Sequence, residues 1–383
     1  MQLKKLGYSE LIGTPQEWTL EGLQLSQKTL LVGRNASGKS RTLSVIANLA
    51  RGLAGLQKAS VHGSYDCTFE DAGRIYHYSI STLKSLVVSE KLIVDDVVML
   101  ERNQGGAGFI FAEKVANGST IEFQTPDTDI AAVSRRDAIQ HSFLEPLYRW
   151  ASTVRYYQFG TSLGKDAMAI FTSTGMNVDE RDPNAVVGIF RDAEKKFGEE
   201  FKNAIKSDMN RIGYNIEDVG IAMPISINLE GLPGVPMALF VKENDLPGIT
   251  DQIGMSQGMF RVLSLLIHVN YFQMRNSTTC VLIDDIGEGL DFSRSCRLIN
   301  LLREKSDNSD IQIILSTNDK FVMNEVPLPE WSVLQRVGNH VKVRNYENSK
   351  KIFDEFKFTG LSNFSFLELD IINEEAEGPT CAD

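Results

Sequence analysis

The 383-residue chain lacks the long hydrophobic runs and the cysteine pairs that mark several common protein classes. No stretch of about 18 uninterrupted apolar residues occurs, so the sequence predicts no transmembrane helix and no membrane partner. The N-terminus, Met1 to Leu6, continues into polar residues without the apolar core of a signal peptide. The four cysteines are not closely spaced, which argues against a zinc site or a disulfide framework. A reducing cytoplasm is the expected location.

A surplus of basic residues is also missing. The chain has 39 Lys and Arg against 50 Asp and Glu, which gives a net charge of −11. Non-specific binding of nucleic acid depends on basic contacts to phosphates, and this charge balance does not indicate them. Local clusters such as Arg135-Arg136 and Lys195-Lys196 are interpreted as solvated faces. Nucleic acid is left open as a partner, but charge does not favour it.

Apolar segments of strand length alternate with segments of helical periodicity, which predicts an α/β fold. The core strands are expected at 20–25, 29–32, 280–283, 311–315 and 332–334, and the core helices after Ser40 and at 136–152, 256–274 and 294–305. Residues 60–125 alternate in hydrophobicity, which predicts an antiparallel β subdomain with turns at Gly105-Gly106 and Asn117-Gly118. A hairpin is expected at 224–242. The apolar stripe from Ile189 to Ile212 predicts one amphipathic helix or two short ones.

A phosphate-binding loop is the strongest motif in the chain. The pattern G-x-x-x-x-G-K-S is matched without exception by Gly33, Arg34, Asn35, Ala36, Ser37, Gly38, Lys39 and Ser40. The loop lies between an apolar strand and a helix, where successive N–H groups and the helix N-terminus bind anionic oxygens. Lys39 is expected to reach the β- and γ-phosphates, and the Ser40 hydroxyl to ligate Mg²⁺. The motif therefore predicts binding of ATP or GTP.

A second acidic motif follows much later in the chain. The apolar strand Val281-Leu282-Ile283 ends in Asp284 and Asp285. At the carboxyl end of a buried strand, Asp284 is expected beside the phosphate loop, where it can hold the magnesium shell. Asp285 is then placed to orient or deprotonate the attacking water. Two acids after an apolar run are by themselves a weak signal, because surface Asp-Asp turns are common.

The order of the remaining motifs makes the pattern specific. Met255-Ser256-Gln257-Gly258-Met259 opens a helix just upstream, and Gly289-Leu290-Asp291 follows the acidic pair. With these motifs the sequence resembles the ABC-type ATPase family, in the branch that includes SMC, DNA-repair and OLD-like ATPases. The resemblance implies that Ser256 and Gly258 are signature residues, which clamp the γ-phosphate held by another subunit, and that Asp291 is the D-loop aspartate. Ser256 can also be interpreted as a simple helix cap.

The resemblance covers residues 1–50 and 250–345 well and the intervening chain loosely. In that intervening part, Gln158 is the candidate for the glutamine that senses magnesium in this family. The segment from Val32 to Leu43, which includes Arg41 beside the nucleotide loop, looks like the compact bacterial group called AAA family ATPases. The implied organisation is an ABC-type head with four parts. These are residues 1–175 with the phosphate loop and β subdomain, a helical insertion at 176–220, the signature and acidic motifs at 221–350, and an extension at 351–383 whose acidic tail is expected to be disordered.

Two positions depart from the family pattern. Asp285 stands where a glutamate is usual and is shorter by one C–C bond, about 1.5 Å. Glu288, three residues on, could substitute only if its loop folds back. The family has a switch histidine at about the place where Asn318 is the nearest polar candidate. An amide cannot take up a proton near neutral pH. These departures predict slow hydrolysis, and hence a nucleotide-gated switch.

Members of this bacterial group often serve anti-phage defence systems such as PARIS, Septu and OLD-related pairs. Only 92 residues follow Asp291, too few for the nuclease that OLD-like proteins append, and the five histidines are scattered. Any nuclease or toxin effector is therefore expected to be a separate partner. The ATP-bound protein is expected to self-associate as an ATP-sandwich dimer or a higher oligomer. A DNA-associated ATPase of the recombination and repair type is the alternative, and salt-sensitive DNA binding would favour it.

Overall fold

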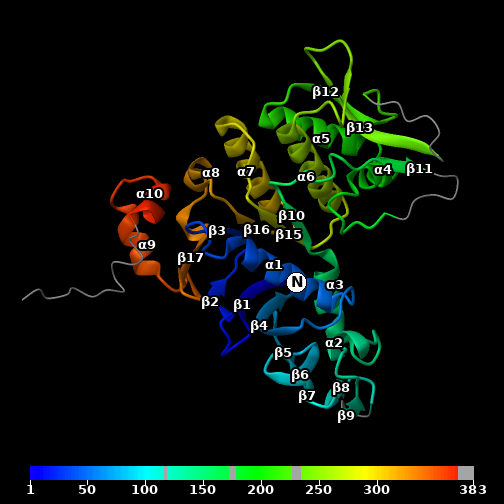
Figure 1. Cartoon of the computed structure of the whole chain (residues 1–383). Coiled ribbons are helices and arrows are strands. Elements are labelled where there is room, and N and C mark those ends of the chain that lie inside the picture. The colour runs from blue at the N-terminus through cyan, green and yellow to red at the C-terminus, as the bar shows by residue number, and fades with distance from the viewer. Residues whose placement is uncertain (116–118, 172–177, 227–233, 370–383) are drawn as a thin grey trace, which may run out of the picture. The chain divides into compact units, whose positions relative to one another are not determined.

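The computed structural model describes residues 1–115, 119–171, 178–226 and 234–369. The chain divides into two compact units (Figure 1). Unit 1 is formed by Met1–Val154 together with the chain from Val326 onward, and unit 2 by Arg155–Glu325. The phosphate loop belongs to unit 1, and the acidic, signature and D-loop motifs belong to unit 2. The four-part division expected from the motifs stays a prediction.

Unit 1 is built on a mixed sheet. Its strands are β1 (Gln2–Glu10), β2 (Trp18–Gln24), β3 (Lys28–Val32), β4 (His62–Asp71), β5 (Arg74–Leu83), β6 (Leu86–Val94), β7 (Val97–Asn103), β8 (Ala107–Ala112), β9 (Ser119–Gln124), β17 (Trp331–Val337) and β18 (His340–Asn345). They follow the order β3-β17-β18-β2-β1-β4-β5-β6-β7-β8-β9. β17 pairs parallel with β3 and β18 parallel with β2, whereas the other neighbours are antiparallel. The strands from β4 onward form the expected antiparallel subdomain.

The helices of unit 1 cover its sheet, and two of them follow its last strand. They are α1 (Lys39–Leu53), α2 (Ala131–Ser134), η1 (Ser142–Leu144), α3 (Glu145–Thr153), η2 (Leu328–Glu330), α9 (Lys350–Lys357) and α10 (Asn363–Glu368). Buried and exposed residues alternate along β4 and β5, as in a sheet with one face packed on a core. Phe69 of β4 contacts Trp150 of α3 edge-on, with ring centroids 4.8 Å apart. In the C-terminal helices, Phe366 packs against Phe353 and Phe356.

Unit 2 contains parallel strands, a separate antiparallel sheet and the helix Gln257–Met274, most of whose residues are buried. Its elements are β10 (Arg155–Gln158), β11 (Ala169–Phe171), α4 (Val186–Phe197), α5 (Glu199–Ile212), β12 (Ile216–Ala222), β13 (Val235–Glu243), β14 (Ile249–Asp251), α6 (Gln257–Met274), β15 (Thr279–Asp284), α7 (Phe292–Asp307), β16 (Ile311–Ser316) and α8 (Lys320–Glu325). β10, β15 and β16 are parallel neighbours in that order. Every residue of β15 and β16 is buried, as expected of parallel strands covered on both faces. A second, antiparallel sheet has the order β11-β13-β12, with β14 on β13.

The predicted helical insertion consists of two helices. α4 ends and α5 begins at Gly198, whose positive φ of 62° is a conformation that glycine adopts readily. α5 packs against α6 and α7, and α4 against α6. In the part of the chain that the structure describes, no helix is long and apolar enough to cross a bilayer.

One local expectation changed, and others fall partly or wholly outside the described residues. The helix expected from residue 136 starts at η1, because Asp137 accepts hydrogen bonds from the N–H groups of Ile139 and Gln140 and forms a turn there instead. The expected hairpin at 224–242 falls partly outside the described residues, and its return strand β13 pairs with β12. Ile225 lies in a bend. The turn at 117–118 and the tail from 370 also lie outside the described residues.

Candidate functional site

The phosphate loop joins β3 to α1 through backbone conformations that its small residues permit. Ala36 and Gly38 have left-handed φ values of 63° and 105°. A Cβ at Gly33 would lie 2.6 Å from Ser37 Oγ and 2.8 Å from the Leu334 carbonyl oxygen, so only glycine fits. Lys39 folds back across the loop, and its Nζ donates to the carbonyl oxygens of Gly33 at 2.9 Å and Arg34 at 3.3 Å.

The loop offers groups that suit an anion. The first turn of α1 contains no acidic residue, so the partial positive charge of its N-terminus is not opposed there. Ser37 Oγ is buried and has no hydrogen-bond partner among the described residues. A buried hydroxyl without a partner is costly, and a phosphate oxygen would satisfy it. The residues present therefore fit a bound phosphate chain.

A tryptophan that the sequence did not single out lies under the start of α1. A Cβ at Gly38 would lie 3.3 Å from Trp18 Cζ2. The Arg41 guanidinium stands 4.4 Å from the centroid of the Trp18 ring and forms an ion pair with Glu10. Tyr8 Oη donates to Glu10 at 2.6 Å, and burial raises the pKa of Tyr8. Arg41 is expected to bind the nucleotide, and its guanidinium here contacts Trp18 and Glu10 of the same unit.

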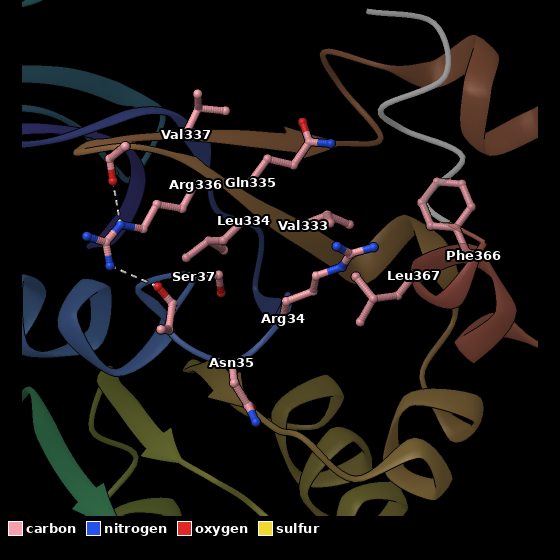
Figure 2. A pocket seen from close by; sticks show the side chains of 12 residues that line it. Arg34, Asn35, Ser37, Val333, Leu334, Gln335, Arg336, Val337, Phe366 and Leu367 are labelled. Atoms are coloured by element: carbon pink, nitrogen blue, oxygen red, sulfur yellow. Dashed lines mark hydrogen bonds between the residues drawn. The ribbon is translucent and has the colours of Figure 1, made fainter.

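A cavity of about 420 Å³ borders the phosphate loop, β17 and α10 (Figure 2). Arg336 projects from β17 beside it. Its Nη1 donates to the Ala36 carbonyl oxygen at 3.2 Å and its Nε to the Gly338 carbonyl oxygen at 2.7 Å, as Figure 2 shows. Arg336 therefore supports the loop at Ala36, one of its two residues with left-handed backbone. Nothing in the sequence around Arg336 indicates this contact.

In unit 2, the acidic pair lies at the carboxyl end of β15. Gln158, the last residue of β10, is in register with Asp284 on the neighbouring strand. Ser316, the last residue of β16, donates its hydroxyl to Asp284 Oδ1. Tyr156 Oη donates to Asp284 Oδ2 at 3.5 Å. The structure thus brings Gln158 and Asp284 together and orients the Asp284 carboxylate from both neighbouring strands.

Asp285 and Asn318 are also brought together. Asn318 Nδ2 donates to Asp285 Oδ1 at 3.1 Å, and the Asp285 N–H donates to Ser316 Oγ at 3.0 Å. Asp285 has a left-handed φ of 54°, a conformation in which aspartate is enriched over most residues. Glu288 donates its N–H to the Asp285 carbonyl oxygen, but its carboxylate lies against Gly160, where a Cβ would be 2.4 Å from Oε2.

Ser256 and Asp291 each cap a helix. Ser256 Oγ accepts from the Met259 N–H at 3.2 Å at the start of α6. Asp291 accepts from the Arg294 N–H at 3.0 Å and from its guanidinium at 2.7 Å. The hydrogen bond from the Arg294 N–H is the main cause of the lowered pKa of Asp291. Both capping residues are exposed. Gly258 lies against the loop before Asp291, because a Cβ there would be 2.8 Å from the Gly289 carbonyl oxygen.

The oxygen donors fit magnesium better than a soft metal. No cluster of three or more His, Cys, Asp or Glu side chains suited to a metal occurs among residues 1–115, 119–171, 178–226 and 234–369. Mg²⁺ does not need such a cage, because it keeps several waters and takes one or two carboxylates together with substrate phosphates. Asp284, with its two hydroxyl donors, matches that requirement.

No protein-family model and no curated protein matches the sequence. Solved structures do match. An SMC head bound to the C-winged helix domain of ScpA has a TM-score of 0.52 at 14% identity, over 92% of this chain and 100% of that chain. The fold is that of an ABC-type ATPase head. The expected fold class is therefore confirmed.

Two further SMC heads have lower scores, and no argument rests on them. The SMC head domain from Thermotoga maritima has a TM-score of 0.41 at 14% identity, over 90% of this chain and 99% of that chain. An Smc head with an extended coiled coil, bound to the C-terminal domain of ScpA and derived from Pyrococcus furiosus, has a TM-score of 0.45 at 12% identity. That match covers 93% of this chain and 99% of the other.

Proposed function

We propose that this ABC-type head binds ATP with Mg²⁺ at Gly33–Ser40 and hydrolyses it slowly. The observation that carries the proposal is the conformation of the phosphate loop, with Lys39 folded across it and the buried Ser37 hydroxyl lacking a partner in the described part of the chain. Glycine is required at Gly33, and Ala36 is held in a left-handed conformation by Arg336. Such a loop presents N–H groups and one cation to a phosphate chain.

Polar residues at the ends of β10, β15 and β16, together with Ser40 of the phosphate loop, support hydrolysis as the reaction. Ser40, Asp284 and Gln158 are the proposed ligands or outer partners of Mg²⁺, which when bound neutralises charge on the β- and γ-phosphate oxygens. Asp285 is the proposed base for the attacking water, and Asn318 fixes its carboxylate through the 3.1 Å bond. Asparagine cannot relay a proton, and aspartate reaches less far than glutamate, so turnover is slow.

Self-association follows from the same proposal. Ser256, Gly258 and Asp291 are the residues that would meet the γ-phosphate held by a second copy. Ser256 and Asp291 are exposed at the starts of two helices, where N–H groups favour an anion, and Gly258 is buried in the first turn of α6. Slow turnover then makes the ATP-bound assembly long-lived. We propose that this assembly controls a separate nuclease or toxin in an anti-phage defence system, as the resemblance to that bacterial group suggests.

One observation favours a second function. One matching structure, with a TM-score of 0.52, is an SMC head, so an SMC-like, DNA-associated ATPase is the other candidate. The net charge of −11 speaks against extensive phosphate contacts. DNA binding that weakens steeply as salt rises would favour this second function over the defence role.

Nucleotide binding is tested with Lys39→Ala. Removing a charge-assisted contact should weaken Mg-ATP binding roughly 10- to 100-fold, measured by titration with a fluorescent ATP analogue. Lys91→Ala is the control, because Lys91 forms a partly exposed ion pair with Glu101 elsewhere in unit 1. Unchanged affinity in Lys39→Ala would contradict the assignment of the loop.

The defence role needs a separate test in cells. Bacteria that express the chain with its genomic neighbours are challenged with phage, and the Lys39→Ala variant serves as the inactive control. We expect fewer plaques with the wild-type chain than with the variant. Equal plaque numbers across a broad phage panel would contradict the defence role and leave the ATPase proposal standing.

A further inference from the structure

The loop after β10 is fastened to the segment that surrounds Ser256 by side-chain hydrogen bonds. The donors are Gln252, Gln257, Arg261 and Ser264, and the acceptors are the backbone carbonyl oxygens of Gly160, Thr161, Leu163, Gly164, Lys165 and Ala167. Gln158 immediately precedes this loop. The contacts therefore join a candidate magnesium-sensing residue to the signature segment, wholly within unit 2.

Gln252 anchors the far end of the loop. Its side chain is fully buried, and Nε2 lies 3.0, 2.8 and 2.9 Å from the carbonyl oxygens of Gly164, Lys165 and Ala167. Its Oε1 accepts from the Leu239 N–H at 3.2 Å. Both ends of this amide are thus satisfied by backbone groups, as a buried amide requires.

Arg261 anchors the near end of the loop and reaches a second loop as well. Its Nη2 donates to the Gly160 carbonyl oxygen at 2.6 Å and its Nε to that of Thr161 at 2.8 Å. Its Nη1 donates to the Glu288 carbonyl oxygen at 3.0 Å. A Cβ at Gly289 would lie 2.8 Å from Nη1, so the guanidinium fits tightly under the chain that leads to Asp291.

The Arg261 guanidinium is held by backbone oxygens. Arg261 is only 9% exposed, yet its three hydrogen-bond partners among the described residues are all carbonyl oxygens. Burying a cation without a carboxylate partner costs free energy, which apolar packing at the same place would avoid. What the guanidinium supplies is a planar fork that fixes three backbone groups from two loops in one geometry.

We propose that Arg261 is a positioning residue that couples Gln158, Ser256 and Asp291. It does so by holding the loop after Gln158 and the loop before Asp291 to the first turns of α6. The inference rests on the proposed ATPase function, and Arg261 acts through these residues without contacting the nucleotide. A shift of Gln158 on binding of Mg-ATP would then be passed to the signature residues as a movement of one body.

The coupling is tested first without reference to activity. Hydrogen exchange is compared in the wild-type chain and Arg261→Ala, with and without Mg-ATP. In the wild type, Mg-ATP should slow exchange in peptides covering 158–167 and 255–263 together. In Arg261→Ala, exchange in 158–167 should rise at least several-fold and lose its response to nucleotide, while the rest of unit 2 keeps its exchange pattern. Unaltered exchange in 158–167 would overturn the proposal.

Kinetics give the second readout. Arg261→Ala should lower kcat for ATP hydrolysis roughly 10- to 100-fold, because small misplacements of reacting groups have effects of this size. KM for ATP should stay within about threefold, since the phosphate loop belongs to unit 1. Arg261→Lys keeps the charge but not the fork and should be intermediate. Arg211→Ala, which removes an exposed ion pair with Glu304, is the control and should leave kcat unchanged.

The two readouts separate the coupling from the ATPase proposal. If the wild-type chain binds but does not hydrolyse ATP, the ATPase proposal fails, and the exchange experiment still decides the coupling. If the wild type hydrolyses ATP and Arg261→Ala keeps its kcat, the coupling fails alone. A third outcome is that kcat of Arg261→Ala falls only in proportion to the loss of folded protein, with faster exchange throughout the chain. Arg261 would then contribute to stability alone, and the coupling would again be overturned.

Discussion

Asp285→Asn is the most informative change to the proposed catalytic residues, because the structure separates its effect on chemistry from its effect on folding. Asp285 has a left-handed φ of 54°, which asparagine tolerates as well as aspartate does. An alanine there would add roughly 1 kcal/mol of backbone strain. The asparagine side chain can still accept the hydrogen bond from Asn318. That bond is then between two neutral groups and is weaker by about 1 kcal/mol.

The catalytic effect should be much larger. A general base contributes roughly 10²- to 10⁴-fold to a rate, which corresponds to about 3–5 kcal/mol of activation free energy. Asp285→Asn should therefore lower kcat for phosphate release by two or more orders of magnitude. Affinity for Mg-ATP should be unchanged, because no group of the phosphate loop is altered. ATP-bound assemblies should then persist.

Three measurements check this reasoning on the purified chain. Phosphate release gives kcat, titration with an ATP analogue gives affinity, and light scattering after size-exclusion chromatography gives the assembly state with ATP. Asp245→Asn is the matched control, since Asp245 is exposed and its carboxylate accepts from Asn215 Nδ2 at 3.3 Å. A kcat for Asp285→Asn above one third of the wild-type value would refute the role of Asp285. Monomers only, in saturating ATP, would refute the shared site.

Three other changes test separate features. Gly258→Ala should weaken ATP-dependent self-association but not ATP affinity, because its Cβ would meet the Gly289 carbonyl oxygen at 2.8 Å; light scattering with ATP would show this. Burial lowers the pKa of His268 from 6.5 to about 4. As pH drops from 6.5 to 4, His268 is therefore protonated in the unfolded chain before the folded one, and the free energy of unfolding falls. The loss should reach about 3 kcal/mol and be absent in His268→Gln, as urea midpoints against pH would reveal. Lys305→Met should destabilise by roughly 3–5 kcal/mol, because the buried Asp208 carboxylate loses its 2.8 Å partner, and adding Asp208→Asn should restore most of the thermal midpoint.

The parts of the site that could be predicted from the sequence are those encoded by contiguous residues. The phosphate loop needs only its own backbone and the adjoining strand and helix, so the motif specifies it locally. The caps at Ser256 and Asp291 are equally local, because each side chain bonds to an N–H three residues on. The sequence does not decide whether α4 and α5 are one helix or two, since an apolar stripe continues across Gly198 whether or not the backbone bends there.

The contacts that orient the acidic pair could not be predicted, because they depend on strand order. Tyr156 and Ser316 reach Asp284 only since β10 and β16 flank β15, and 128 residues separate Tyr156 from Asp284. Hydrophobic patterning shows that each strand is buried but not which strands are neighbours. The same limit applies to the described start of the hairpin expected at 224–242. The N–H groups of Ile225 and Ser226 bind the Asp251 carboxylate, a side-chain partner that alternation of apolar residues does not reveal.

The strand order of unit 1 has a consequence for how the chain must fold during synthesis. β2 and β3 are consecutive in sequence, yet β17 and β18 lie between them in the sheet. Until residues 331–345 leave the ribosome, β2 and β3 each present an open edge, and the whole of unit 2 is made in the meantime. Closing the sheet requires a loop that spans most of the chain, which is slow and leaves edges exposed to wrong pairing. The nascent protein therefore depends on its last strands, and a hairpin supplied as a separate fragment covering 326–369 should be able to complete a chain that ends at Glu325.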